Sequence, residues 1–297
     1  MRNDKFLNYI HLHFIVFIWG FTAVLGALIS VNALPLVWYR MAIATVLIFL
    51  YIKVRKINIK FTFKTISGFL LAGILIAMHW LAFFGAIKVS NVSVTLAIMS
   101  TGAFFASFLE PIFFKRKVIW YEVFFGILVI AGLYIIFEFE SQYLTGILLA
   151  LASSFLGVLF TLLNGKFIEQ YNATAISFYE LGFGAICVTI VLFFNGSFTA
   201  ELFVLKPSDW VYLLILASAC TAYAFIASIH VLKWISPYTM MLTVNLEPVY
   251  GILLAVAILG DSEKMSPQFY YGAILILSTV IANGIVKISA KRKKEKV

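Results

Sequence analysis

The chain has 297 residues, of which 63% are hydrophobic and only 12% are charged, and its mean hydropathy is +1.03. Soluble domains carry about 25% charged residues, so this composition excludes a soluble domain and predicts an integral membrane protein. The net charge of +9 is not taken as a sign of nucleic-acid binding, because the basic residues flank apolar segments as they do in cytoplasmic loops of membrane proteins.

Apolar runs of membrane-spanning length, separated by charged residues, Pro, Asn and Ser, follow one another along the whole chain. Each crossing of a bilayer takes about 20 apolar residues. The first run is too long for a signal peptide and is read as an uncleaved span. The sequence therefore predicts an all-α membrane protein with ten transmembrane helices at residues 12–30, 35–52, 66–87, 92–114, 118–137, 143–165, 173–194, 209–230, 236–259 and 268–288.

The basic residues predict the orientation of these spans. With the N-terminus inside, all but four of the 22 Lys and Arg residues fall in cytoplasmic loops and tails, including Arg116, Lys117 and Lys296. Positively charged loops stay on the cytoplasmic side of a membrane. We therefore expect a multi-pass protein of the cytoplasmic membrane with both termini in the cytoplasm.

The two halves of the chain match each other in register. Asn32 and Tyr39 match Asn172 and Tyr179 at a shift of 140, and later matches follow at shifts of 145 and 146. We expect a first five-helix repeat at 1–140, a second at 141–290, and a basic cytoplasmic tail at 291–297. Because each repeat has an odd number of spans, the second must lie inverted relative to the first.

Short motifs in this ten-span frame resemble the EamA-type branch of the drug/metabolite transporter superfamily. They are Trp19-Gly20, Pro35 with Arg40, Leu246-Glu247-Pro248, Gly260-Asp261 and Gly272. The resemblance covers about residues 13–288 and implies two tandem five-helix repeats. It also implies a proton- or gradient-driven carrier in a bacterial cytoplasmic membrane, of a kind that commonly exports amino acids or other small metabolites.

Three ionisable residues inside spans are candidates for coupling or gating: Arg40, Glu180 and Glu247. A charge at the bilayer centre costs several kcal/mol, so it must face protein or water. Arg40 and Glu180 differ by 140 positions, which suggests an ion pair or a water-bridged gate across the pseudo-two-fold axis, broken in one of the two access states. The alternative is that each is satisfied locally. Glu247 precedes Pro248, which should bend the ninth span, and an acid at a bend suits proton coupling.

Polar and aromatic residues on the inner faces of the spans are candidates for a substrate cavity. The competing interpretation is that small and hydroxyl-bearing residues let helices pack closely or bond to their own backbone. The candidates are Trp19, Thr22, His79, Ser100, Thr101, Thr161, Tyr223, Thr243 and Asn245.

A secondary transporter of a small metabolite explains these features together. The chain has no phosphate-binding GxxxxGK[ST] motif, and its two cysteines lie in apolar stretches, so we predict no catalytic residues, no metal site and no cofactor. The alternative function is a membrane-embedded enzyme that acts on a lipid or lipid-linked substrate. The expected partners are the small-molecule substrate and membrane lipids; a coupling proton and a homodimer are left open, and nucleic acid is not expected.

Overall fold

The computed structural model describes residues 2–115 and 120–294, and these residues form helices and the short loops between them. Arg116, Lys117, Lys296 and the first two residues of the fifth predicted span lie outside the described residues. The α-helices are α1 (Arg2–Leu28), α2 (Ala33–Arg55), α3 (Phe63–Val89), α4 (Val92–Met99), α5 (Gly102–Phe113), α6 (Trp120–Phe139), α7 (Leu144–Phe167), α8 (Ala173–Phe194), α9 (Pro207–Ala217), α10 (Ala224–Val231), α11 (Pro237–Val244), α12 (Glu247–Leu259) and α13 (Pro267–Lys294).

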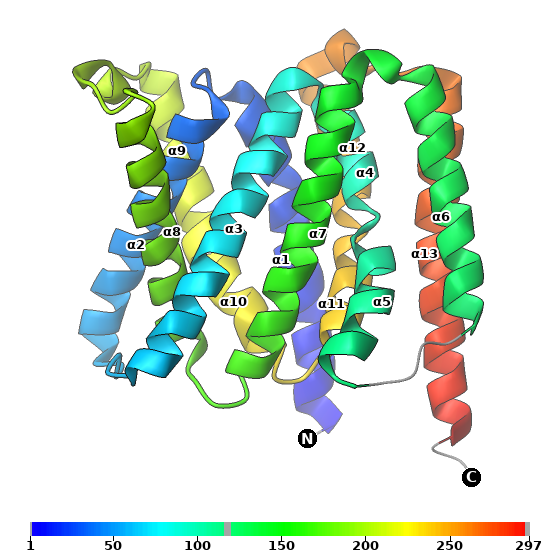
Figure 1. Ribbon diagram of the computed structural model, residues 1–297, viewed down its shortest axis with the longest axis horizontal. Helices are drawn as coiled ribbons and strands as arrows, with labels where there is room; N and C mark the ends of the chain where they lie inside the picture. The colour runs from blue at the N-terminus through cyan, green and yellow to red at the C-terminus, as the bar shows by residue number, and fades with distance from the viewer. Residues whose placement is uncertain (1, 116–119, 295–297) are drawn as a thin grey trace.

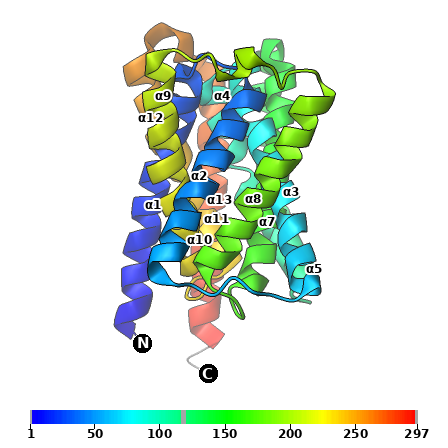
Figure 2. The ribbon, with the colours of Figure 1, turned by 90° about the vertical axis from the view of Figure 1, so that its left-hand side faces the viewer.

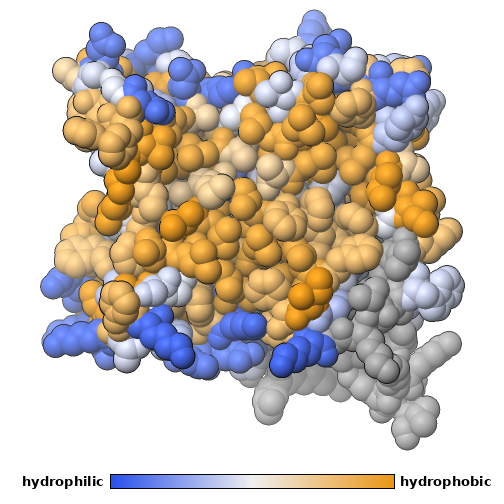
Figure 3. Space-filling model, viewed as in Figure 1, coloured by the Kyte–Doolittle hydropathy of each residue, from blue (hydrophilic) through white to orange (hydrophobic). Residues whose placement is uncertain are grey.

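The helices assemble into the membrane spans that the sequence predicts. Over the described residues, nine helical segments are long and apolar enough to cross a membrane, and the shorter apolar part of α6, Phe124–Phe139, is the tenth. On the face in Figure 3, hydrophobic residues form a broad belt between two hydrophilic ends. The all-α fold and the multi-pass membrane class are confirmed.

The two repeats run in opposite directions, and helices of one repeat pack against helices of the other. Both termini lie at the same end of the bundle (Figures 1 and 2), and α1 rises from that end whereas α7, which opens the second repeat, returns to it. The main helix pairs join the two halves: α1 with α12, α2 with α8, α3 with α7 and α8, and α6 with α13. The buried apolar residues of both halves therefore contribute to a shared core.

Asn or Ser stands at the N-cap position of equivalent helices in the two repeats, although the side chain of Asn32 makes no capping hydrogen bond. Asn32 and Asn172 precede α2 and α8, and Asn91 and Ser236 precede α4 and α11. The side chains of Asn91, Asn172 and Ser236 each accept a hydrogen bond from a backbone N–H of the first turn. Asn and Ser are preferred caps because they satisfy such donors. The first cap pair is 140 positions apart and the second 145, which matches the shifts between the halves.

Acidic side chains join helix ends at the end of the bundle opposite the termini. Asp209 accepts hydrogen bonds from the backbone N–H of Ser30 at 2.8 Å and from its hydroxyl at 2.5 Å, which ties α9 to the end of α1. Glu263 accepts from the N–H groups of Val92 and Ser93 at 3.1 and 2.8 Å. A carboxylate at the start of a helix is stabilised by the free N–H groups there.

The pair α6 and α13 packs with glycines at its crossing. A Cβ atom added to Gly132 would lie 3.0 Å from the carbonyl oxygen of Gly272, and one added to Gly272 would lie 2.9 Å from that of Gly132. Small residues let membrane helices approach closely in this way. Backbone oxygens cannot move aside without shifting a helix, so the crossing depends on both glycines.

We predict that Gly132→Val or Gly272→Val lowers the melting temperature of the detergent-solubilised protein by several degrees, because overpacking costs about 1–3 kcal/mol. Thermal unfolding followed by size-exclusion chromatography measures this. Gly182→Ala is the matched control, since its Cβ would meet only Thr45 Cγ2 at an ordinary 3.5 Å. Equal melting temperatures for all three variants and the parent protein would contradict the close crossing.

Candidate functional site

Two transmembrane spans are interrupted at equivalent places. The fourth span breaks at residues 100–101 between α4 and α5, and the ninth breaks at residues 245–246 between α11 and α12. The residues that begin the second half-helices, Gly102 and Glu247, differ by 247 − 102 = 145 positions, the shift found between the halves. Pro248, in the first turn of α12, cannot donate a backbone hydrogen bond, so the helix is interrupted where the sequence predicts a bend.

The eighth span contains a wider turn. A π-helix, η3 (Ser218–Tyr223), joins α9 to α10. The hydroxyl of Thr221 donates to the carbonyl of Leu216, five residues earlier, at 2.6 Å. Such π-helical turns displace backbone groups from the regular ladder and are frequent at functional sites. Here the turn presents the Thr221 hydroxyl and the Cys220 carbonyl to a neighbouring helix.

The side chain of Arg40 from α2 binds to this turn. Its Nε donates to Thr221 Oγ1 at 2.6 Å, and Nη2 donates to Cys220 O at 3.4 Å. The guanidinium carbon lies 3.8 Å from the centre of the Trp80 ring, a favourable cation–π position. Arg40 is only 2% exposed, and its Nη1 has no hydrogen-bond partner among the described residues. One donor of a buried cation is therefore available to a ligand.

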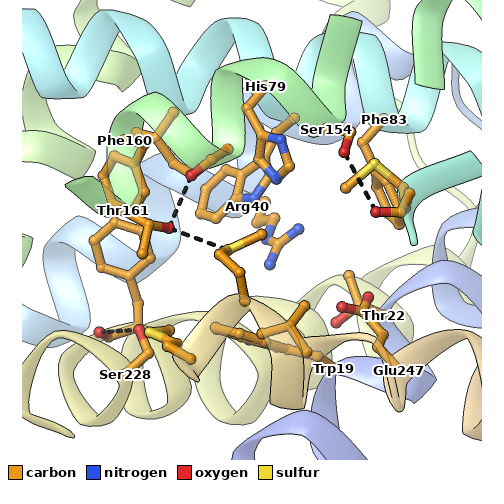
Figure 4. Close-up of a pocket in the computed structure, with 18 residues that line it drawn as sticks. Trp19, Thr22, Arg40, His79, Phe83, Ser154, Phe160, Thr161, Ser228 and Glu247 are labelled. Carbon is orange, nitrogen blue, oxygen red and sulfur yellow. Dashed lines mark hydrogen bonds between the residues drawn. The ribbon is translucent and has the colours of Figure 1, made fainter. Parts of the chain in front are cut away.

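A cavity with about 110 Å³ of free volume lies around this guanidinium. Figure 4 shows the Arg40 side chain in the middle of the cavity, with His79 and Ser154 on one side and Trp19, Thr22 and Glu247 on the other. Helices of both repeats contribute to its wall. The lining residues are Trp19, Thr22, Arg40, Ile76, His79, Trp80, Phe83, Met99, Ser154, Gly157, Phe160, Thr161, Phe225, Ser228, Met240, Met241, Val244 and Glu247.

His79 in the cavity wall is held by α7. Its Nδ1 lies 2.8 Å from the carbonyl oxygen of Ser153, which can only accept, so Nδ1 carries the proton and donates. The Ser153 hydroxyl donates back to the carbonyl of His79 at 2.9 Å. Gly157 makes room for the ring, since a Cβ there would lie 3.0 Å from His79 Cε1. In the neutral ring, Nε2 is left as a hydrogen-bond acceptor.

The cavity contains one basic and one acidic side chain of opposite repeats. Arg40 and Glu247 both line it and interact electrostatically. Within the described part of the chain they form no direct salt bridge, and both line the same cavity. An opposite charge in a shared low-dielectric space reduces the cost of burying each group.

Arg40 and Glu180 form no ion pair among the described residues in this conformation, so their pairing in another access state stays a prediction. Arg40 is directed to Thr221, Trp80 and Glu247, and the Glu180 carboxyl group lies away from the cavity with neither oxygen hydrogen-bonded. The Arg40 and Glu180 side chains do not contact each other, although α2 and α8 pack side by side, because the two helices direct them to different neighbours.

Only some of the residues singled out in the sequence line the cavity. Trp19, Thr22, His79 and Thr161 do so, together with Arg40 and Glu247. The others lie elsewhere. Ser100 and Thr101 are buried at the break of the fourth span, where the Thr101 hydroxyl donates a hydrogen bond to the Ser154 hydroxyl. Thr243 donates to the carbonyl of Thr239, and Asn245 is buried at the break of the ninth span.

Tyr223 lies outside this cavity, contrary to its selection as a lining residue. It is 44% exposed, and its hydroxyl lies 2.9 Å from Nε2 of His11 on α1. The physical reason is the π-helix, because the wide turn changes which face of the span its last residue occupies. Helical periodicity alone assumes a regular turn and therefore misplaces this side chain.

Most of the apolar wall was not identified from the sequence. Its main members are Trp80, Phe83, Phe160, Phe225 and the methionines 99, 240 and 241. In a chain with 30 Phe residues, hydropathy does not distinguish an aromatic ring facing a cavity from one facing lipid. In the sequence, the position of Trp80 directly after the membrane-embedded His79 was the one indication that one of these aromatic residues lines the cavity.

We predict that Thr221→Val destabilises the folded protein by about 1.5–3 kcal/mol, because it leaves Nε of a buried guanidinium without its partner. Thr221→Ser keeps the hydroxyl and should stay close to the parent protein. Thermal unfolding in detergent compares the two variants. If Val and Ser behave alike, the hydrogen bond to Arg40 does not contribute as inferred.

Comparisons with known proteins agree with this architecture. The model of the EamA-like transporter family matches the chain twice, over residues 9–138 and 144–284. A solved structure titled only "Crystal structure of protein" is similar with a TM-score of 0.66 and 14% identity, over 93% of this chain and 96% of that one. At this identity the likeness shows the fold alone. No curated protein matches the chain. With one family match in each half of a ten-span membrane bundle, the chain belongs to the EamA-like transporter family.

Proposed function

We propose that the protein is a secondary transporter that exports a small zwitterionic metabolite, an amino acid or a related compound, by alternating access. The observation that carries this proposal is the cavity between the two repeats, in which Arg40 and Glu247 face each other without a direct salt bridge. Binding sites of transporters with inverted repeats lie near the membrane midplane at the interface between the repeats, beside interrupted helices.

The two charges suit the two ends of an amino acid. The free Nη1 of Arg40 donates to the substrate carboxylate, and a guanidinium is well shaped for this anion. The carboxylate of Glu247 accepts from the substrate ammonium group. A zwitterion satisfies both buried charges at once, whereas a neutral compound leaves both unmet.

The rest of the wall favours an apolar side chain on the substrate. Trp19, Phe160 and Phe225 supply aromatic surface, and Met240 and Met241 supply flexible apolar surface. Methionine adapts to irregular shapes, and ligand sites typically combine an apolar wall with a few polar groups that fix orientation. Leucine, methionine and phenylalanine are therefore the first compounds to assay.

Proton coupling in this scheme follows from competition at Glu247. A proton and the substrate ammonium group cannot occupy the same carboxylate, so each displaces the other. A proton entering down its gradient then drives the substrate in the opposite direction. The breaks at 100–101 and 245–246 are the places where the spans can bend as access changes sides.

We place the protein in the cytoplasmic membrane with both termini in the cytoplasm. The support is the distribution of Lys and Arg, which collect in loops at the end of the bundle where the described termini lie. In this orientation the ends of α1 and α9 joined by Ser30 and Asp209 face outward.

We predict that proteoliposomes containing the protein accumulate a labelled apolar amino acid when a pH gradient is imposed. Arg40→Lys should weaken substrate binding ten- to hundredfold, since a hydrogen bond to a charged group contributes about 1.5–3 kcal/mol. Glu247→Gln should abolish gradient-driven accumulation, because a neutral amide exchanges no proton. Flux of the labelled compound, measured with and without the gradient, tests both variants.

The matched control for the acid is Glu169→Gln, which removes an exposed carboxylate and should leave flux unchanged. Competition by analogues that lack the carboxylate or the ammonium group should be weak. Unchanged gradient-driven flux in Glu247→Gln would exclude this residue as the coupling group, and no flux of any compound by the folded protein would contradict the carrier function.

The orientation predicts which loop residues a membrane-impermeant thiol reagent reaches in intact cells. In a background with Cys187 and Cys220 replaced by Ser, a cysteine at Ser197 should be labelled from outside and one at Lys60 only after lysis. Both positions are exposed. The reverse labelling pattern would show that the protein has the opposite orientation in the membrane.

A further inference from the structure

Glu180 is a buried acid that lies outside the cavity and takes no part in the function proposed above. Glu180, on α8, is 0% exposed, and within the described residues neither carboxyl oxygen has a hydrogen-bond partner. Next to it lies Asn164 of α7, also 0% exposed, whose Oδ1 has no partner either. Its amide nitrogen donates to Phe160 O at 3.2 Å, which leaves one amide hydrogen unused.

Glu180 and Asn164 lie close to the cavity, because Asn164 is on α7, which also forms part of the cavity wall. Phe160 and Thr161 of α7 line the cavity, and Asn164 is one helical turn further toward the end of α7 at Phe167. That end carries Lys166 and belongs to the side of the basic loops. The backbone around Glu180 is tightly enclosed, since a Cβ on Gly73 of α3 would lie 2.6 Å from the Glu180 carbonyl oxygen.

No basic group among the described residues compensates a charge on Glu180, although several lie on the helices packed around it. Arg40 of α2 is bound to Thr221, and His79 of α3 is bound to Ser153. Lys166 of α7 lies over the rings of Phe113 and Phe114, and His230 of α10 is exposed. The remaining cations of these helices lie near their ends: Lys53, Arg55, Lys64 and Lys88.

An ionised carboxylate in this place would be an uncompensated buried charge, which costs several kcal/mol. A neutral carboxylic acid is complementary to a carboxamide, because its O–H can donate to the amide oxygen while its carbonyl accepts an amide hydrogen. This arrangement would satisfy both carboxyl oxygens of Glu180 and Oδ1 of Asn164. Asn164 is the side chain that interacts with this carboxyl group, so rotation of the two side chains toward each other would form the pair.

We propose that Glu180 is a second proton-binding site, which holds its proton while the bundle encloses it and forms a carboxylic acid–amide pair with Asn164 once the two side chains rotate toward each other. The proton leaves to water, and the carboxylate is left behind, when α8 moves away from α2 and α3, the helices packed against it, far enough to admit solvent. The site then links the occupancy of a proton to the opening of the bundle on the side of the basic loops. This inference does not depend on the identity of the substrate or on the role of Glu247.

Infrared difference spectroscopy of the purified protein in lipid tests the proposal directly, because a protonated carboxyl group has a carbonyl band separate from that of a carboxylate. We expect such a band at neutral pH, absent in Glu180→Gln, whose side chain mimics the neutral acid in shape. Asn164→Leu should keep the band and move it to higher frequency, because the hydrogen bond to the carbonyl is lost. Transfer to D₂O should shift the band in the parent protein.

Two controls make the assignment specific. Glu169→Gln removes an exposed acid at the same end of the bundle and should leave the band in place. Glu247→Gln should leave the Glu180 band in place whether or not Glu247 contributes one of its own.

The proposal is overturned if folded Glu180→Gln retains the full protonated-carboxyl signal of the parent. Should Glu180→Gln fail to fold, an unshifted spectrum in Asn164→Leu overturns the pairing. Failure of the transport assay would leave this readout unaffected.

Discussion

The requirement that backbone hydrogen bonds be satisfied inside a hydrocarbon layer organises this structure. Lipid offers no donors or acceptors, so irregular backbone is tolerated only where protein or an internal aqueous space surrounds it. The chain departs from regular α-helix within the bundle at the breaks at 100–101 and 245–246 and at the π-helix Ser218–Tyr223. Each of these irregular segments adjoins residues of the cavity, and the π-helix supplies the hydroxyl and carbonyl groups that hold Arg40.

The interleaving of the two inverted repeats explains why the cavity lies between them. The main helix contacts join one half to the other, so neither repeat could bury its apolar faces alone. Arg40 comes from the first repeat, and the turn that holds it comes from the second. Likewise His79 of the first repeat is held by Ser153 of the second. The polar groups of the cavity are therefore positioned across the interface, where relative movement of helices can change them.

Five ionisable residues among those described, Asp209, Glu263, Arg40, Glu247 and Glu180, are buried or line the cavity and illustrate three physical situations. At one end of the bundle, Asp209 and Glu263 accept hydrogen bonds from backbone N–H groups and join helix ends. In the cavity, Arg40 and Glu247 face each other across open space. Glu180 has only a neutral amide beside it. The cost of a buried charge is met by backbone dipoles in the first situation, by an opposite charge in the second, and by a proton, as we infer, in the third.

The sequence by itself determined the membrane class, the ten spans, their inverted duplication and the interruption at Pro248, because these follow from hydropathy, length and the missing N–H of proline. Of the residues that polarity within apolar spans singled out, Arg40, Glu247, Trp19, Thr22, His79 and Thr161 line the cavity. Only the tertiary structure decided that Arg40 faces Glu247 and not Glu180, that a π-helix directs Tyr223 out of the cavity, and which aromatic rings form the wall. Those outcomes depend on helix rotation and packing, which hydropathy does not encode because lipid-facing and cavity-facing apolar residues are chemically the same.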